Sequence, residues 1–224
     1  MKNTRFLPVV LVIMMLILAC GLSIGGSQVV QGSGKITSQE RTVSEFTSIE
    51  LAGSGNVTVQ VGGTQSVLVQ TDDNIQPLIE TTVRGGKLVI GTKSNTSINT
   101  KQPIRVNITV ASLDSVSLTG SGNITISDMT ADTAKISLQG SGNITASGNA
   151  QKVQATLEGS GNIVCTDLQA SSATARITGS GNISVNASQS LDASISGSGT
   201  IKYRGNPNKV NQSVTGSGSI NPIP

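Results

Sequence analysis

The sequence predicts an all-β protein, a right-handed parallel β-helix with a more irregular β half before it, and two observations support this prediction. The residues Gly-Ser-Gly-Asn-Ile recur with small changes, with first glycines at 120, 140, 159, 179, 197 and 216, a spacing of 18 to 20 residues. Around each motif, apolar residues occupy every second position. A fixed period of this length is typical of solenoids, in which each repeat forms one coil of a stack. Alternation of apolar and polar residues is the period of a β-strand.

The N-terminus predicts export and anchoring. Lys2 and Arg5 precede an apolar run of 14 residues, 6–19, which is shorter than the roughly 20 residues that a membrane-spanning helix needs. A basic start followed by a short apolar run is typical of a secretory signal. The run ends in Ile17-Leu18-Ala19-Cys20, which resembles the lipobox of bacterial lipoproteins. We therefore expect a signal peptide over 1–19 and a lipid on Cys20 that anchors the protein without spanning the membrane. An ordinary signal peptide or an uncleaved anchor is the alternative.

The next segments predict a tether and an irregular β region. Residues 20–40 are rich in Gly, Ser and Gln and are expected to form a flexible tether. Residues 41–112 alternate over 48–51, 56–61 and 104–110, which predicts strands. The pair Gly85-Gly86 predicts a hairpin, since paired glycines supply the positive φ of a tight turn. Residues 73–78, around Pro77, are expected to form a loop or a short helix.

Residues 113–224 predict the β-helix proper. Each coil should contain a strand, a bend at Gly-Ser-Gly-Asn, a second strand and a looser return, with Ile and Leu pointing inward. Glycine allows each bend, and the asparagines should hydrogen-bond along the stack. A phosphate cradle is the competing reading of these glycines, but it requires a following helix, and here a strand follows. Gln212 in a core column and Pro222 predict that the last coil is a C-terminal cap. The structural turn residues are Gly120, Gly122, Asn123, Gly140, Gly142, Asn143, Gly159, Gly161, Asn162, Gly179, Gly181 and Asn182.

Three segments together carry a resemblance to a known family. They are the Gly-Ser-Gly-Asn-Ile repeats, the entry Arg41-Thr42-Val43-x-x-Phe46-x-x-Ile49 and the closing Tyr203-x-Gly205-Asn206-Pro207. Together they resemble the head GIN domain of putative auto-transporter adhesins, over about 41–221. The resemblance implies a β-helical fold similar in shape to pectin lyases but without their catalytic residues. It also implies a role in adhesion.

The composition excludes several kinds of site. The chain has no His, so neither a Ser/His/Asp triad nor an imidazole-bound zinc is available. From residue 20 onward it has 13 basic and 12 acidic residues, and the whole chain has three aromatic residues, which argues against nucleic-acid binding. The bends lack the Asp that calcium-binding β-rolls require. The pair Asp72-Asp73 is expected in a solvated loop, and Cys165 in the core.

The charged residues of the repeats do not predict catalysis. Lys135, Glu158, Arg176 and Asp192 take outward positions, and we expect an exposed ion pair between Glu158 and Arg176. We therefore expect a non-catalytic, lipid-anchored protein of the bacterial cell envelope, outside the cytoplasm, with no cofactor and no metal. Its partners would be the membrane and a polysaccharide or surface protein, and it would be a monomer. The alternatives are a carbohydrate-active enzyme of pectin-lyase-like shape and a structural or signalling-associated envelope module.

Overall fold

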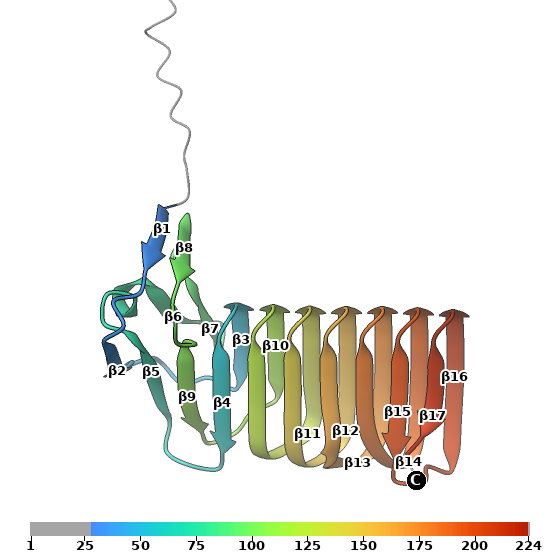
Figure 1. Ribbon diagram of the computed structural model, residues 1–224. Helices are drawn as coiled ribbons and strands as arrows, with labels where there is room; N and C mark the ends of the chain where they lie inside the picture. The colour runs from blue at the N-terminus through green and yellow to red at the C-terminus, as the bar shows by residue number, and fades with distance from the viewer. Residues whose placement is uncertain (1–27, 224) are drawn as a thin grey trace, which may run out of the picture.

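The computed structural model describes residues 28–223, so the predicted signal peptide and Cys20 lie outside the described residues. The described chain is a β-solenoid, which confirms the predicted all-β class. Its strands form one sheet of 15 strands and one of two strands. The large sheet folds around itself, so that the solenoid is flattened and has two broad faces (Figure 1).

The centre of the solenoid is a stack of four long strands in parallel register. Each begins after one Gly-Ser-Gly bend and ends at the next, so its first part lies on one face and its last part on the other. Equivalent residues of successive repeats lie opposite one another, as Ile124 with Ile144 and Leu138 with Leu157. This confirms the predicted stacking, while the winding sense remains a prediction. The four strands are β11 (Asn123–Gly140), β12 (Asn143–Gly159), β13 (Asn162–Gly179) and β14 (Asn182–Gly197).

The first face, here called the Asn face, consists of six short strands and the first parts of the four long strands. Its order follows from the pairings of β2 with β5, β5 with β9, β9 with β4 and β4 with β11. After the first parts of β11 to β14 it continues through β15 and β17. The strands outside the central stack are β2 (Ile36–Glu40), β5 (Ser66–Asp72), β9 (Arg105–Val110), β4 (Asn56–Val61), β15 (Thr200–Arg204) and β17 (Ser219–Pro222).

The second face, here called the mixed-charge face, lies behind the first in Figure 1. It runs from β6 through β7, β3 and β10 to the last parts of β11 to β14 and then to β16. Its strands outside the central stack are β6 (Ile79–Arg84), β7 (Lys87–Thr92), β3 (Ser48–Gly53), β10 (Ser115–Gly120) and β16 (Lys209–Gly216).

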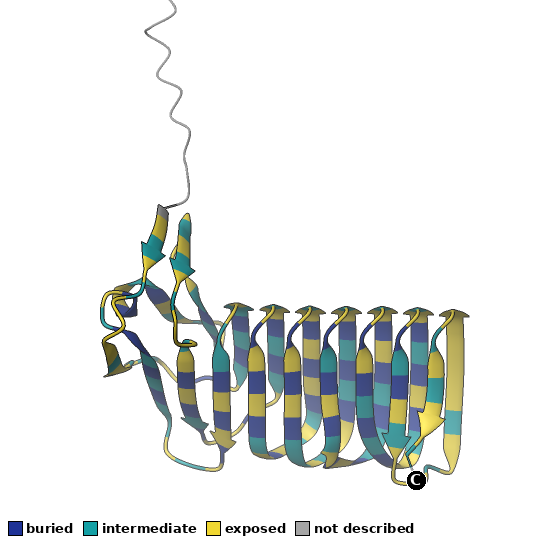
Figure 2. Cartoon of the chain, viewed as in Figure 1, coloured by how far each residue is buried: buried dark blue, intermediate teal, exposed yellow. Residues whose placement is uncertain are grey.

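The core is a narrow apolar layer between the two faces. Buried and exposed residues alternate along the strands (Figure 2), as the sequence pattern predicts. Alanines hold several inward positions, so the layer stays thin where larger side chains face them. The isoleucine column that follows the bends is at most 1% exposed, and it consists of Ile124, Ile144, Ile163, Ile183 and Ile201.

The N-terminal end of this core is closed by a crossing segment. The chain passes from β5 on the Asn face to β6 on the mixed-charge face through a short 3-10 helix, η1 (Gln76–Leu78), which confirms the predicted loop or short helix. Ile75 and Ile79 are 0% and 4% exposed. Gln76 is also buried, and its amide donates to the carbonyl oxygens of Val69 (2.8 Å) and Thr37 (2.9 Å). Because both amide donors of Gln76 are hydrogen-bonded, this polar side chain can be buried at the N-terminal end of the core.

Two further features of the N-terminal half bear on the predictions. Gly85 and Gly86, at φ 56° and 74°, join β6 to β7 as an antiparallel hairpin, as predicted. The prediction of a flexible tether is wrong for residues 28–40, because β1 (Gln28–Gln31) pairs with β8 (Thr96–Asn99) and β2 pairs with β5. Both partners lie far along the sequence, outside any repeat.

The return segments of the coils are also more regular than predicted. Instead of a loose return, the backbone strand pairing continues from one face to the other. The turn is accommodated by register shifts, such as those after Ile126 and Thr145. Asp128, at φ 58°, and Gly148, at φ 129°, lie at these shifts. Such bulges bend a strand without ending it.

The C-terminal end is more open than the N-terminal end. β16 and β17 are the last strands of their faces. Gln212 is exposed and Val214 is 43% exposed, whereas Val210 and Ile220 are half-buried. β16 is accordingly exposed along most of its length in Figure 2.

A charge in the isoleucine column should destabilise the fold. We predict that Ile163→Asp lowers the free energy of unfolding by about 3 to 5 kcal/mol, because it buries a carboxylate without a partner. Ser160→Asp is the matched control, since Ser160 is exposed at the neighbouring bend, and it should cost less than about 0.5 kcal/mol. Urea unfolding of both variants measures the difference. Equal losses would contradict the inward and outward assignment.

Removing the last coil should uncover the core. We predict that deletion of residues 206–224 causes self-association, because Ile195 and Ile201, now 3% and 0% exposed, would lie at a bare strand edge. Light scattering on two proteins that both start at Gln28, with and without this deletion, measures the effect. A truncated protein that stays monomeric and equally stable would show that the last coil does not protect the core.

Candidate binding face

The Gly-Ser-Gly corners bring the backbones of successive coils into close contact. The first glycine of each corner has a positive φ, as Gly140 (128°) and Gly159 (129°). A Cβ on either would overlap the carbonyl oxygen of the equivalent glycine in the preceding coil. That oxygen accepts two backbone hydrogen bonds, so Gly140 O receives the N–H of Ser160 (2.9 Å) and of Gly161 (3.2 Å).

The second glycine of each central corner, from Gly122 to Gly199, is buried and similarly confined. A Cβ on Gly161 would overlap the carbonyl oxygen of Gly142, and it would also approach Leu138 Cδ2 at 2.6 Å. The corners of Gly120 and Gly122, and of Gly179 and Gly181, repeat this arrangement. The corner amides therefore bond to the adjacent coil, which leaves them no role as a phosphate cradle.

The asparagines after the corners form a directional ladder. Each side-chain amide donates to the side-chain oxygen of the asparagine in the preceding coil: Asn123 to Asn56 (2.9 Å), Asn143 to Asn123 (2.8 Å), Asn162 to Asn143 (2.8 Å) and Asn182 to Asn162 (2.9 Å). Successive amide hydrogen bonds polarise one another. The ladder thus fixes the orientation of five side chains on the Asn face.

The ladder is part of two outward-facing rows that cross the Asn face from β9 to β17. Residues of a row lie on adjacent strands, which are about 4.8 Å apart. The first row contains Arg105, Asn56, Asn123, Asn143, Asn162, Asn182, Thr200 and Ser219. The second row contains Asn107, Thr58, Thr125, Thr145, Val164, Ser184, Lys202 and Asn221.

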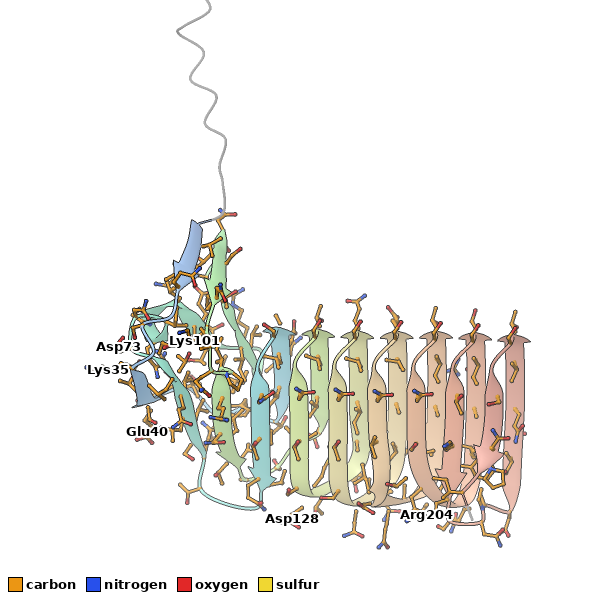
Figure 3. The ribbon with its side chains drawn as sticks, viewed as in Figure 1. Lys35, Glu40, Asp73, Lys101, Asp128 and Arg204 are labelled. Atoms are coloured by element: carbon orange, nitrogen blue, oxygen red, sulfur yellow. The ribbon has the colours of Figure 1, made fainter. Side chains whose placement is uncertain are left out.

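These rows hold two cations and no acid. Arg105 lies at one end and Lys202 near the other, and amides, hydroxyls and one valine lie between them. Arg204 lies beside Lys202 on β15 (Figure 3). The alternation over 104–110 predicts a strand, but Arg105 is outside the repeats, so its place in the first row is visible only in the fold.

The mixed-charge face differs from the Asn face. Lys87 Nζ and Glu50 Oε2 form an ion pair at 2.6 Å, and Lys135, Arg176 and Asp192 are exposed on later coils. The expected ion pair between Glu158 and Arg176 is not formed in the described part of the chain. Arg176 lies opposite Thr156, and Glu158 accepts a hydrogen bond from Gln139 Nε2 (3.2 Å). Apart from the Lys87–Glu50 ion pair, these charges are scattered along the face.

The Asp72-Asp73 pair is not a solvated loop as predicted. Asp72 is 1% exposed and accepts a hydrogen bond from the backbone N–H of Gly34 (2.5 Å). Asp73 accepts from the Ser33 hydroxyl (2.6 Å). This hydrogen bond, together with nearby Lys35, lowers the pKa of the Asp73 carboxyl. Both acids therefore hold the segment before β2 against the segment after β5, at the end of the molecule opposite Arg204 (Figure 3).

The remaining candidates are structural. Cys165 is buried in a core column, and its burial raises the pKa of the thiol to about 12, so at neutral pH it is not a thiolate nucleophile. Within residues 28–223, no cluster of three His, Cys, Asp or Glu side chains is placed to hold a metal ion. The same part of the chain contains no helix of the length and apolarity that crossing a membrane requires.

Comparisons with known proteins agree with this architecture. A putative adhesin from Bacteroides fragilis is 27% identical, with a TM-score of 0.70 over 87% of this chain and 100% of that one. A putative lipid binding protein from Parabacteroides distasonis is 28% identical, with a TM-score of 0.60 over 88% and 100%. A putative adhesin from Parabacteroides merdae, 19% identical with a TM-score of 0.55 over 88% and 99%, shares the fold. No curated protein sequence matches the chain.

The family comparison identifies the chain. Its match covers residues 45–207, from the entry into the first coil to the loop after β15, and so includes most of both faces and every corner before the one at Gly216. The names of the family and of these structures are those of adhesins, which act at the cell surface, and of a lipid-binding protein. The chain belongs to the family of putative auto-transporter adhesins with a head GIN domain.

Proposed function

We propose that this protein is a non-catalytic binding protein of the bacterial cell surface whose Asn face binds polysaccharide. The observation that supports this most is the continuity of the two outward rows across the Asn face. They present amide and hydroxyl groups at a regular interval of about 4.8 Å. A flat, repeating set of hydrogen-bonding groups suits an extended polymer with repeating hydroxyls better than a small molecule, which fits a concave site.

Binding on such a face would rest on many weak hydrogen bonds. The two rows contain no aromatic residue, so stacking of sugar rings does not contribute. Each exposed hydrogen bond contributes little, about 0.5 to 1.5 kcal/mol, and affinity would therefore grow with the length of polymer bound. A surface protein with an exposed polar strand is the other class of partner. The experiment below distinguishes it from a polysaccharide.

Catalysis is the less supported alternative. A glycoside hydrolase of the common type needs two carboxyl groups flanking the scissile bond, about 5 to 10 Å apart. The two rows of the Asn face contain no carboxylate. On the mixed-charge face, Glu158 is on β12 and Asp192 is on β14, so β13 lies between them. The names of the related proteins also favour binding over catalysis.

A variant pair separates the two faces. Thr145 on the Asn face and Ser137 on the mixed-charge face are both exposed strand residues of neighbouring parts of the chain. We predict that Thr145→Glu weakens binding of the best glycan found on an array by about tenfold or more, the equivalent of about 1.4 kcal/mol. The matched variant Ser137→Glu should leave binding unchanged.

Titration of the immobilised glycan with the purified full chain measures both affinities. Equal affinities for the two variants would place binding elsewhere. A chain that binds no glycan but captures a surface protein through the same face would replace polysaccharide by protein as the partner.

The lipid anchor is the second part of the proposal and rests on Ile17-Leu18-Ala19-Cys20. Acyl chains on Cys20 would hold the binding face outside the cytoplasm, at the membrane surface. We predict that Cys20→Ser moves the protein from the membrane fraction of a bacterial host to the soluble fraction or blocks its processing. Mass spectrometry of the wild-type N-terminus checks this directly, and a mature protein without acyl chains would disprove the anchor.

A further inference from the structure

A depression of about 370 Å³ lies on the Asn face where β9, β4 and β11 run side by side. Two polar residues from each strand line it, which are Arg105, Asn107, Asn56, Thr58, Asn123 and Thr125. Elsewhere along the rows the coils repeat almost unchanged. Here the regular stack, through β4, meets β9, which lies outside the repeats. The depression therefore combines asparagines of the ladder with Arg105, a cation from outside the repeats.

Arg105 is a free cation at this place. It is exposed, and no hydrogen bond or ion pair joins its guanidinium to any of residues 28–223. Its neighbours in the row are Gln70 on β5 and Asn56 on β4, and neither is an acid. A guanidinium is planar and matches a carboxylate with two parallel hydrogen bonds.

The ladder supplies a second donor beside Arg105. Because each asparagine donates to the one before it, Asn56 accepts from Asn123 and donates to no residue of the described chain. Its NH₂ group is therefore unused at the head of the ladder, in the row position next to Arg105. A cation and an adjacent amide donor, with no acid in the lining, form a site for an anion.

The other cations of the face extend this pattern. Lys202 and Arg204 are exposed on β15, six strand spacings from Arg105, or about 29 Å at 4.8 Å per strand. The rows between them are uncharged. Cations at or near both ends of the two rows suit a polymer with repeated negative charges rather than a single small anion.

We propose that the Asn face binds an acidic polysaccharide, with one sugar carboxylate held by Arg105 and Asn56 in the depression and the polymer running across the strands toward Lys202. This inference rests on the proposed function and specifies its ligand. The hydroxyls of Thr58 and Thr125 and the amide of Asn107 line the same depression and bond to the ring hydroxyls.

The test uses polygalacturonate and its fully methyl-esterified form, which share a backbone and differ in charge. The full chain, purified in mild detergent, should bind polygalacturonate at least about tenfold more tightly than the ester, since hydrogen bonds to charged groups are the stronger ones. Arg105→Gln should remove most of this preference, because it weakens binding of polygalacturonate more than binding of the ester. Lys202→Gln should reduce the preference to a smaller extent.

The control is Arg176→Gln, which removes the same charge from the mixed-charge face, where Arg176 is also exposed. It should not alter the preference. Equal binding of the two polymers, or equal losses for Arg105→Gln and Arg176→Gln, would overturn the inference. The proposed function is tested separately, because the Thr145→Glu experiment uses the best array glycan whatever its charge. Failure of the charge preference would therefore leave polysaccharide binding by the Asn face in place. If Thr145→Glu binds both polymers as tightly as the wild-type chain does, the Asn face is not the binding surface.

Discussion

The close backbone contact at the Gly-Ser-Gly corners is the constraint on which the rest of the structure depends. The corner carbonyls of Gly120, Gly140 and Gly159 each accept two N–H groups from the next coil, and the space between the backbones excludes a Cβ. Successive coils can therefore stack in only one register at the corner. Because side chains alternate along a strand, that register also decides which residues enter the core and which form the rows of each face.

The repeats made the regular half predictable, because a short period places like residues in one column. The Asn column, the isoleucine column and the outward position of Glu158 all follow from counting along the chain from a glycine. The strands around Gln28 and Ile36 could not be found in this way. Their partners, Thr96 and Asp72, lie outside any period, and a Gly- and Ser-rich segment has weak strand preference until such a partner is present.

The candidate site shows the same division. The sequence predicts the asparagines of the ladder, but it places neither Arg105 beside Asn56 nor the depression between them. That neighbourhood arises where an irregular strand continues the face of the regular coils. Burial of Asp72 is a similar case, because its partner is the backbone N–H of Gly34, 38 residues earlier. Contacts of this kind depend on tertiary pairing, which local patterns do not record.

The open C-terminal end has a consequence for how such proteins can diverge. In solenoids each coil packs mainly against its neighbours. Within residues 28–223, β16 and β17 end their faces without a closing segment like that of Gln76. Duplication or loss of one coil would therefore change the length of the Asn face by about 4.8 Å while its chemistry stayed the same. If the Asn face binds a polysaccharide as proposed, the number of coils would set how many polymer units fit between Arg105 and Lys202.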